Sequence, residues 1–113
     1  MKYLDFVTTL LAMIMGTIHV VLTPNFYDSF GEDAVFFIGM GLSIFLLGII
    51  NLMRLLSKAM TNRVLAMASN CLYFIYIFAS AMVLGITEVQ VIISISLVGI
   101  MTYCSIRDIR MVY

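Results

Sequence analysis

The residues of this chain that could do chemistry centre on His19, its single histidine. An imidazole can serve as a general base, a metal ligand or a hydrogen-bonding group near neutral pH. Ser80 and Ser94, in two other apolar segments, are expected at the same depth as His19, so their hydroxyls could reach the ring. Ser43 is expected at a similar level and Glu88 near the rim. These five residues are the predicted ligand-binding site, a small polar pocket open to one end of the molecule.

Catalysis and metal binding are not favoured by this set of residues. A serine nucleophile needs a base that a third group orients, and Glu88 could approach His19 only from the rim. A catalytic metal site needs about three suitable ligands close together, whereas Cys71 and Cys104 are expected at the opposite end from His19. Haem would need His19 with a methionine, or two copies of His19 across a dimer. The sequence therefore predicts no enzyme, no metal and no cofactor, with haem or quinone redox work as the least favoured alternative.

His19 lies on a stripe of small and polar residues along the first apolar segment. Positions spaced by three and four residues share one face of a helix. In lipid, small residues let helices approach closely and polar ones are shielded by a neighbouring helix, so this small-polar stripe should face the bundle interior. Two interpretations stay open: packing with one satisfied histidine, or an outward-facing functional site. The stripe consists of Asp5, Thr9, Ala12, Gly16, His19 and Thr23.

The composition is that of a membrane protein. Apolar residues make up 64% of the 113 residues and charged residues 11%, against about 45–50% and about 25% in soluble domains. A chain this apolar has too little polar surface to cover a water-soluble globule, and its length allows one domain. No basic run interleaved with aromatics suggests nucleic acid as a partner. The expected partners are the lipid bilayer and, within it, a second copy or another membrane protein.

Four segments have the length of a membrane span, at about 4–23, 30–56, 64–86 and 89–106. A helix needs about 20 mostly apolar residues to cross about 30 Å of hydrocarbon. The short links between the segments favour antiparallel neighbours. The sequence thus predicts an all-α membrane protein, a four-helix up-down-up-down transmembrane bundle that forms a single domain over residues 1–113.

Local signals predict where these helices end. A residue before proline leaves helical geometry, so the first helix should end at Thr23–Pro24. The patterns Ser29–Glu32 and Thr87–Gln90 fit capping boxes, in which two side chains satisfy free backbone N–H groups at a helix start. Asn62 is the expected N-cap of the third helix, and Gly85 its C-terminal stop.

The charged residues divide between the two ends of the predicted bundle. All Lys and Arg residues flank one side, and the other side carries acids without a cation. Because Lys and Arg concentrate in short cytoplasmic flanks, both termini should be cytoplasmic in a bacterial inner membrane. Cations at the C-terminal end of the second helix also interact favourably with the negative end of its dipole. The basic side has Lys2, Arg54, Lys58, Arg63, Arg107 and Arg110, and the acidic side has Asp28, Glu32, Asp33 and Glu88.

Two amides, Asn51 and Asn70, form a predicted structural pair. Each lies a little more than one turn inside the basic end of its predicted helix, and the short link between these helices brings them side by side. A hydrogen bond between such groups in a membrane contributes about 0.6–2 kcal/mol. The pair is expected to fix the register of the two helices rather than to bind a ligand.

Three runs in the first half of the chain carry a resemblance to a known group of proteins. They are Gly16-x-x-His19-x-x-x-Thr23-Pro24, Phe36-Phe37-x-Gly39-x-Gly41-Leu42 and Leu47-Gly48-x-x-Asn51. They resemble uncharacterised small four-span proteins of the bacterial inner membrane, broadly DoxX-like in architecture, which implies that location and no activity. The favoured function is a non-enzymatic bundle that binds a partner or itself. The alternative is a small-molecule binder or transporter with an outward-facing polar pocket around His19.

Overall fold

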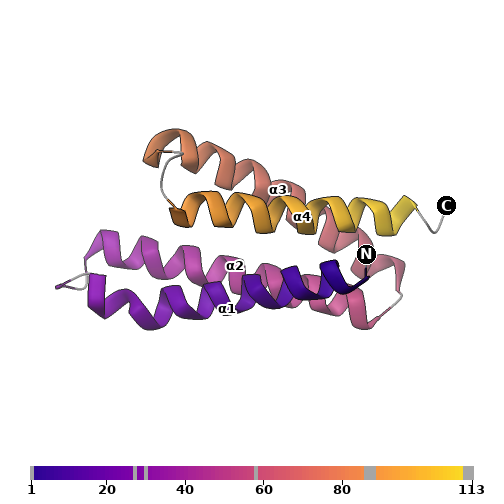
Figure 1. Cartoon of the computed structure of the whole chain (residues 1–113), viewed down its shortest axis with the longest axis horizontal. Coiled ribbons are helices and arrows are strands. Elements are labelled where there is room, and N and C mark those ends of the chain that lie inside the picture. Colours follow the sequence, from indigo (N-terminus) through magenta and orange to yellow (C-terminus); the bar gives the residue numbers. More distant parts are fainter. Residues whose placement is uncertain (1, 27, 30, 58, 86–88, 111–113) are drawn as a thin grey trace.

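Four helices make up almost all of the chain in the computed structural model (Figure 1). The structure describes residues 2–26, 28–29, 31–57, 59–85 and 89–110. These residues contain no strand, and consecutive helices run in opposite directions. The predicted all-α four-helix bundle is therefore confirmed. The helices are α1 (Lys2–Phe26), α2 (Glu32–Leu56), α3 (Met60–Leu84) and α4 (Val89–Arg110).

Each of the four helices is long and apolar enough to cross a membrane. The first three have 25 residues each and α4 has 22, which at about 1.5 Å per residue exceeds the roughly 30 Å of a hydrocarbon core. A helix satisfies its backbone hydrogen bonds internally, as a lipid-exposed segment must. Many large apolar side chains on all four helices face outward. The protein is accordingly a multi-pass membrane protein.

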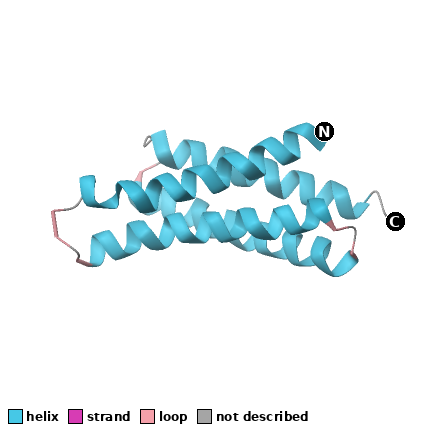
Figure 2. Ribbon diagram, turned by 90° about the horizontal axis from the view of Figure 1, so that it is seen from below, coloured by secondary structure: helices cyan, strands magenta, loops and turns pink. Residues whose placement is uncertain are grey.

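The helices pack as two hairpins (Figure 1, Figure 2). α1 packs chiefly against α2, and α3 against α4, while the α1–α4 and α2–α3 contacts that join the hairpins are less extensive. The bundle measures 50 × 25 × 21 Å. Both ends of the chain lie at the same end of the bundle as the α2–α3 connection, to the right in Figure 1. We refer to this end, with Lys2 and Arg110, as the terminal end, and to the opposite one, with Phe26 and Val89, as the loop end.

Glycines on facing sides let α1 and α2 approach closely. A Cβ atom on Gly16 would lie 2.5 Å from the Gly41 carbonyl oxygen, and one on Gly41 would lie 2.7 Å from the His19 Cβ. A Cβ on Gly48 would collide with the Met13 side chain. No larger residue fits at the first two positions unless a backbone moves, so these glycines set the spacing of the first hairpin.

The small-polar stripe of α1 faces the other helices, as predicted. Thr9 and Ala12 are fully covered, Asp5 and Thr23 are nearly so, and His19 is half-buried. The Thr23 hydroxyl donates to the His19 carbonyl oxygen at 2.8 Å. Such a bond within one helix satisfies a hydroxyl without any partner from another helix. The stripe can therefore pack closely while most of its polar groups stay hydrogen-bonded.

Two predicted helix ends at the loop end are wrong. α1 continues through Pro24 to Phe26, although proline supplies no N–H to the helix. α2 begins at Glu32, and its N-cap Gly31 makes no side-chain hydrogen bond, so the Ser29–Glu32 capping box does not form. Instead, the Gly31 N–H donates to the Ser29 carbonyl at 3.1 Å. This tight turn takes the place of the side-chain cap.

Of the two predicted ends of α3, the start is wrong and the end is confirmed. The helix begins at Met60, after Ala59 in extended backbone, so Asn62 lies inside the first turn and the prediction that it is the N-cap is wrong. Gly85 ends the helix as predicted. Its φ of 104° lies in the left-handed region that favours glycine. The Thr87–Gln90 cap rests on residues outside those that the structure describes.

Candidate functional site

A small cavity between the two hairpins lies toward the loop end, around His19. Its volume is about 10 Å³, the space of a single water molecule. Pockets that hold organic ligands measure about 300–1,000 Å³, so the hairpins would have to separate before such a ligand could enter. All four helices contribute to its lining, which consists of Met15, His19, Met40, Ile44, Tyr73, Ile77 and Ser94.

The imidazole of His19 contacts its own helix and an aromatic ring of α2. Its Nδ1 lies 3.1 Å from the Met15 carbonyl oxygen. Since a carbonyl oxygen only accepts, Nδ1 carries the proton in this contact. The ring stacks on Phe37, with centroids 4.6 Å apart and an interplanar angle of 23°. The partner of Nδ1 is thus a backbone carbonyl, where the sequence suggested a serine hydroxyl.

The predicted pocket residues take up different positions around the bundle. Ser94 lines the cavity together with His19. Ser43 is exposed and its hydroxyl donates to a carbonyl of α2 at 2.6 Å, because the side of α2 that faces α1 is the one with Gly41 and Gly48. Ser80 is half-buried on α3 and does not line the cavity. Glu88 lies outside the described residues. The structure therefore brings His19 together with Ser94 and places Ser43 and Ser80 away from the cavity.

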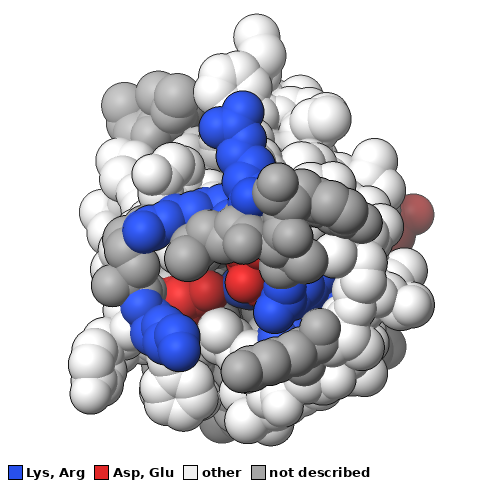
Figure 3. Space-filling model, turned by 90° about the vertical axis from the view of Figure 1, so that its right-hand side faces the viewer, with Lys and Arg blue, Asp and Glu red and all other residues white. Residues whose placement is uncertain are grey.

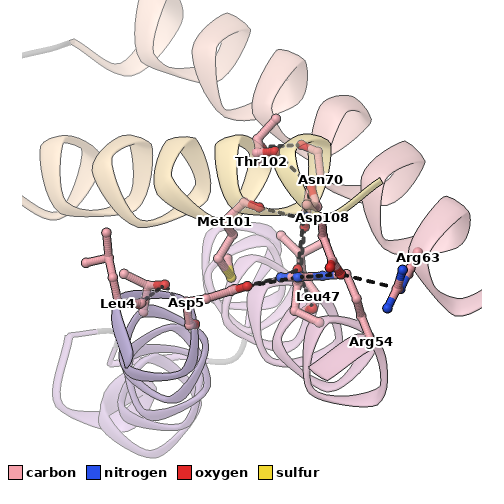
Figure 4. A network of polar contacts seen from close by, with 12 residues as sticks. Leu4, Asp5, Leu47, Arg54, Arg63, Asn70, Met101, Thr102 and Asp108 are labelled. Atoms are coloured by element: carbon pink, nitrogen blue, oxygen red, sulfur yellow. Dashed lines mark hydrogen bonds and ion pairs between the residues drawn. The ribbon is translucent and has the colours of Figure 1, made fainter. Parts of the chain in front are cut away.

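A larger polar cluster, the Arg54 network, fills the interior at the terminal end (Figure 4). Arg54 of α2 contacts Asp5 of α1 in a fork, with Nη1 donating to Oδ2 at 2.8 Å and Nη2 to Oδ1 at 2.7 Å. Nη1 also donates to Oδ2 of Asp108 on α4 at 3.3 Å. Bidentate charge-assisted bonds are among the strongest in proteins, and the Arg54 side chain is fully covered. The network comprises Asp5, Asn51, Arg54, Arg63, Asn70, Ser105 and Asp108.

Asn51 and Asn70 join α2 to α3 within this network. Nδ2 of Asn51 donates to Oδ1 of Asn70 at 2.7 Å, and Nδ2 of Asn70 donates to Oδ1 of Asn51 at 2.9 Å. Nη2 of Arg54 donates to the same Asn51 oxygen at 3.1 Å. Asn70 also donates to the Ser105 hydroxyl and to the Met101 carbonyl of α4, at 3.0 and 3.2 Å. The predicted bond between the two amides is present, and it belongs to a chain of contacts that touches all four helices.

The charges of the Arg54 network balance. Arg54 and Arg63 face Asp5 and Asp108, and Nε of Arg63 lies 3.8 Å from Oδ2 of Asp108. Two cations and two carboxylates leave no net charge, which limits the cost of removing them from water. Three buried atoms of this region have no hydrogen bond to the described residues: Oγ1 of Thr9 and the Nε atoms of Arg54 and Arg63. The network thus links the helices and has no surplus charge to attract an ion.

An apolar layer separates the His19 cavity from the Arg54 network. Its side chains come from α1, α2 and α4 and are each at most 4% exposed, with aromatic rings of α3 packed against them. Ions and protons cross a membrane along polar groups or water, and this layer offers neither among the residues described. The interior therefore has no continuous polar path between the two clusters. The layer consists of Ala12, Ile44, Leu47, Val98 and Met101.

Sequence patterns do not single out the Arg54 network, although two signals point to it. From the sequence, Arg54 is interpreted as a cation at the C-terminal end of the second helix. It follows Asn51 by three residues, however, so both lie on one face of α2. Asp5 and Asp108 are the two acids on the side that otherwise carries cations. Acids in that position indicate buried ion pairs with some of those cations.

Metal-binding side chains do not gather in the described part of the chain. It contains no group of three or more His, Cys, Asp and Glu that could hold a metal ion. Cys71 is half-buried, Cys104 is buried, and neither is in a disulfide. Comparison of the chain with protein-family models, with curated proteins and with solved structures finds no match.

Proposed function

We propose that this protein is a non-enzymatic membrane bundle that acts by binding a partner membrane protein or a second copy of itself. The observation that carries the proposal is the filled interior. The cavity beside His19 has room for about one water molecule. The apolar layer closes the route from this cavity to the Arg54 network. A larger hollow of about 340 Å³, between the ends of α1 and α2, lies at the outer surface of the loop end. Binding then takes place on the outside of the bundle.

The outer faces offer large apolar side chains and one small-residue notch. Leu72, Met82 and Val83 on α3 are between 70% and 86% exposed. On α2, a Cβ at Gly39 would meet nothing within 4 Å, and Ser43, one turn further, is exposed as well. Small residues at this spacing let helices approach closely in lipid. Packing among the described residues does not use this notch, which supports α2 as a contact surface for another helix.

The proposal includes a bacterial inner membrane as the location, with both termini in the cytoplasm. The positive-inside rule supports this orientation, because all Lys and Arg residues of the sequence belong to the termini and the connection at the terminal end. A reporter fused after Tyr113 should be active in the cytoplasm, and a cysteine in place of Ser29 should react with a reagent added outside. Outside labelling of a cysteine at Lys58 would overturn the orientation.

Site-specific photocrosslinking in the membrane tests the binding proposal. A photoreactive residue is placed on the exposed face of each helix in turn. A discrete protein adduct is expected from the α2 position, at the mass of a dimer if the occupant is a second copy. Adducts to lipid alone from all four positions would contradict the proposal. The positions are Val21, Ser43, Val83 and Ile93, each exposed.

The second candidate, a small-molecule binder or transporter, rests on the polar lining of the cavity. The imidazole of His19, the phenol of Tyr73 and the hydroxyl of Ser94 are brought together there. Ser94→Leu should fill the cavity, and Ser96→Leu, on the exposed face of the same helix, is its matched control. Loss of the cellular phenotype in the Ser94 variant alone, with folding and insertion intact, would favour the pocket. Unchanged phenotype and unchanged crosslinks in that variant would exclude it.

A further inference from the structure

The cations at the terminal end fall into two groups. Arg54 and Arg63 are paired with Asp5 and Asp108 inside the Arg54 network. The other described cations lie outside it, exposed or half-buried, and make no ion pair with the residues that the structure describes. Figure 3 looks onto this end and shows Lys and Arg side chains around a smaller acidic area. We refer to the second group as the terminal cations, which are Lys2, Arg107 and Arg110.

The contacts of the Arg54 network bring together the two helix ends that carry the terminal cations. One guanidinium, that of Arg54, contacts both Asp5 and Asp108 at 2.7–3.3 Å. The start of α1 and the end of α4 therefore lie within reach of a single side chain. Lys2 precedes Asp5 by about one turn, and the other two terminal cations flank Asp108 along α4. The three terminal cations thus belong to two helix ends that lie next to each other at the terminal end.

Exposed aromatic and apolar side chains border the terminal cations on the membrane side. Tyr3 and Phe6 of α1 are 87% and 42% exposed, and Tyr103 and Ile106 of α4 are 60% and 37% exposed. Aromatic rings at the ends of spans lie at the level of the lipid headgroups, and long cationic side chains extend toward the same level. Positive charge next to an exposed apolar surface matches an amphiphile with an anionic head.

We propose that the terminal cations bind the phosphate of an anionic phospholipid whose acyl chains lie along the exposed sides of α1 and α4. The guanidinium groups of Arg107 and Arg110 match phosphate oxygens in pairs, and Lys2 adds a point charge. Arg54 takes no part, because its side chain is fully covered and already paired. A free phosphate would use the same cations but not the apolar border, so the lipid is the occupant that the surface fits better.

Native mass spectrometry of the full-length protein in detergent tests this surface, with phosphatidylglycerol and phosphatidylcholine as probes. A cation near an anionic lipid surface strengthens binding about fivefold. The variant Arg107→Gln/Arg110→Gln should therefore bind phosphatidylglycerol about 25-fold more weakly, with phosphatidylcholine binding unchanged. The matched control Arg107→Lys/Arg110→Lys keeps both charges without the paired guanidinium contacts and should lose clearly less affinity than the glutamine variant. Asp33→Asn, at the loop end, should change nothing.

Two results would overturn the lipid surface. One is equal binding of phosphatidylglycerol by the wild type and the double glutamine variant. The other is displacement of phosphatidylglycerol by glycerol 3-phosphate at similar concentration, which would assign the cations to a free phosphate. Lys2→Gln, on a different helix, should weaken binding about fivefold. Such a loss would show that weaker binding does not depend on a folding defect in the double variant of α4. The measurement requires neither a protein partner nor an orientation, so its failure would leave the proposed function standing.

Discussion

Replacement of Asp5 by leucine should destabilise the bundle by about 2–4 kcal/mol, because it leaves the buried Arg54 guanidinium short of a partner. Arg54 donates two hydrogen bonds to Asp5, at 2.7 and 2.8 Å. Hydrogen bonds to charged groups contribute about 1.5–3 kcal/mol each, so the fork amounts to about 3–6 kcal/mol. Asp108 still accepts from Arg54 at 3.3 Å and offsets part of the loss. The expected cost therefore falls below that sum.

A double-mutant cycle separates the loss of the ion pair from the loss of a side chain. Asp5→Leu with Arg54→Met removes both charges, and its cost should be smaller than the sum of the two single costs by about 2–4 kcal/mol. Unfolding by SDS in mixed micelles, followed by circular dichroism, gives the free energies. Asp33→Asn, on the exposed loop end, should stay within about 0.5 kcal/mol of the wild type. Additivity of the two network changes within about 0.5 kcal/mol would refute the reasoning.

Two further predictions use the same assay. Asn51→Leu and Asn70→Leu should be non-additive by about 0.5–1.5 kcal/mol, because the second change finds no partner left to remove. Simple additivity would show that the two amides do not bond in the membrane. Gly41→Ala should destabilise by about 1–3 kcal/mol, since its Cβ would lie 2.7 Å from the His19 Cβ, whereas Gly39→Ala meets nothing within 4 Å and should be close to neutral. Equal effects of the two alanines would contradict the close approach of α1 and α2.

Helical periodicity carries much of what the sequence can predict here. Spacings of three and four identify the buried side of α1 because burial repeats with the turn of the helix. Asn51 and Asn70 can be paired for a related reason, since both lie at similar distances from one short connection. Gly85 can be placed at a helix end because few other residues adopt positive φ. In each case, the structural cause acts within one helix or across one link.

The Arg54 network depends instead on contacts between distant parts of the chain. Asp5 and Arg54 are 49 residues apart, and Asp108 follows 54 residues later. The spacing from Asn51 points to one face of α2, but no local pattern says which carboxylates meet Arg54 and Arg63 there. A turn at Gly31 replaces the predicted Ser29 cap. The free backbone N–H groups at a helix start can be satisfied in either way, and the sequence does not decide between the two. The size of the His19 cavity depends on how closely the hairpins approach, and that follows from packing along their whole length.

The one-sided distribution of charge gives the molecule an electrical polarity along its 50 Å axis. The terminal end has six cations and two acids, a formal charge of +4, and the loop end has four acids, a formal charge of −4. A membrane potential acts on each charge with about 2.3 kcal/mol per 100 mV. From the orientation proposed above, turning the bundle over would move about eight charges against a potential that is negative in the cytoplasm, at a cost of about 18 kcal/mol at 100 mV. An energised membrane would therefore hold every copy in the same orientation, and copies of opposite orientation could not pair as antiparallel dimers.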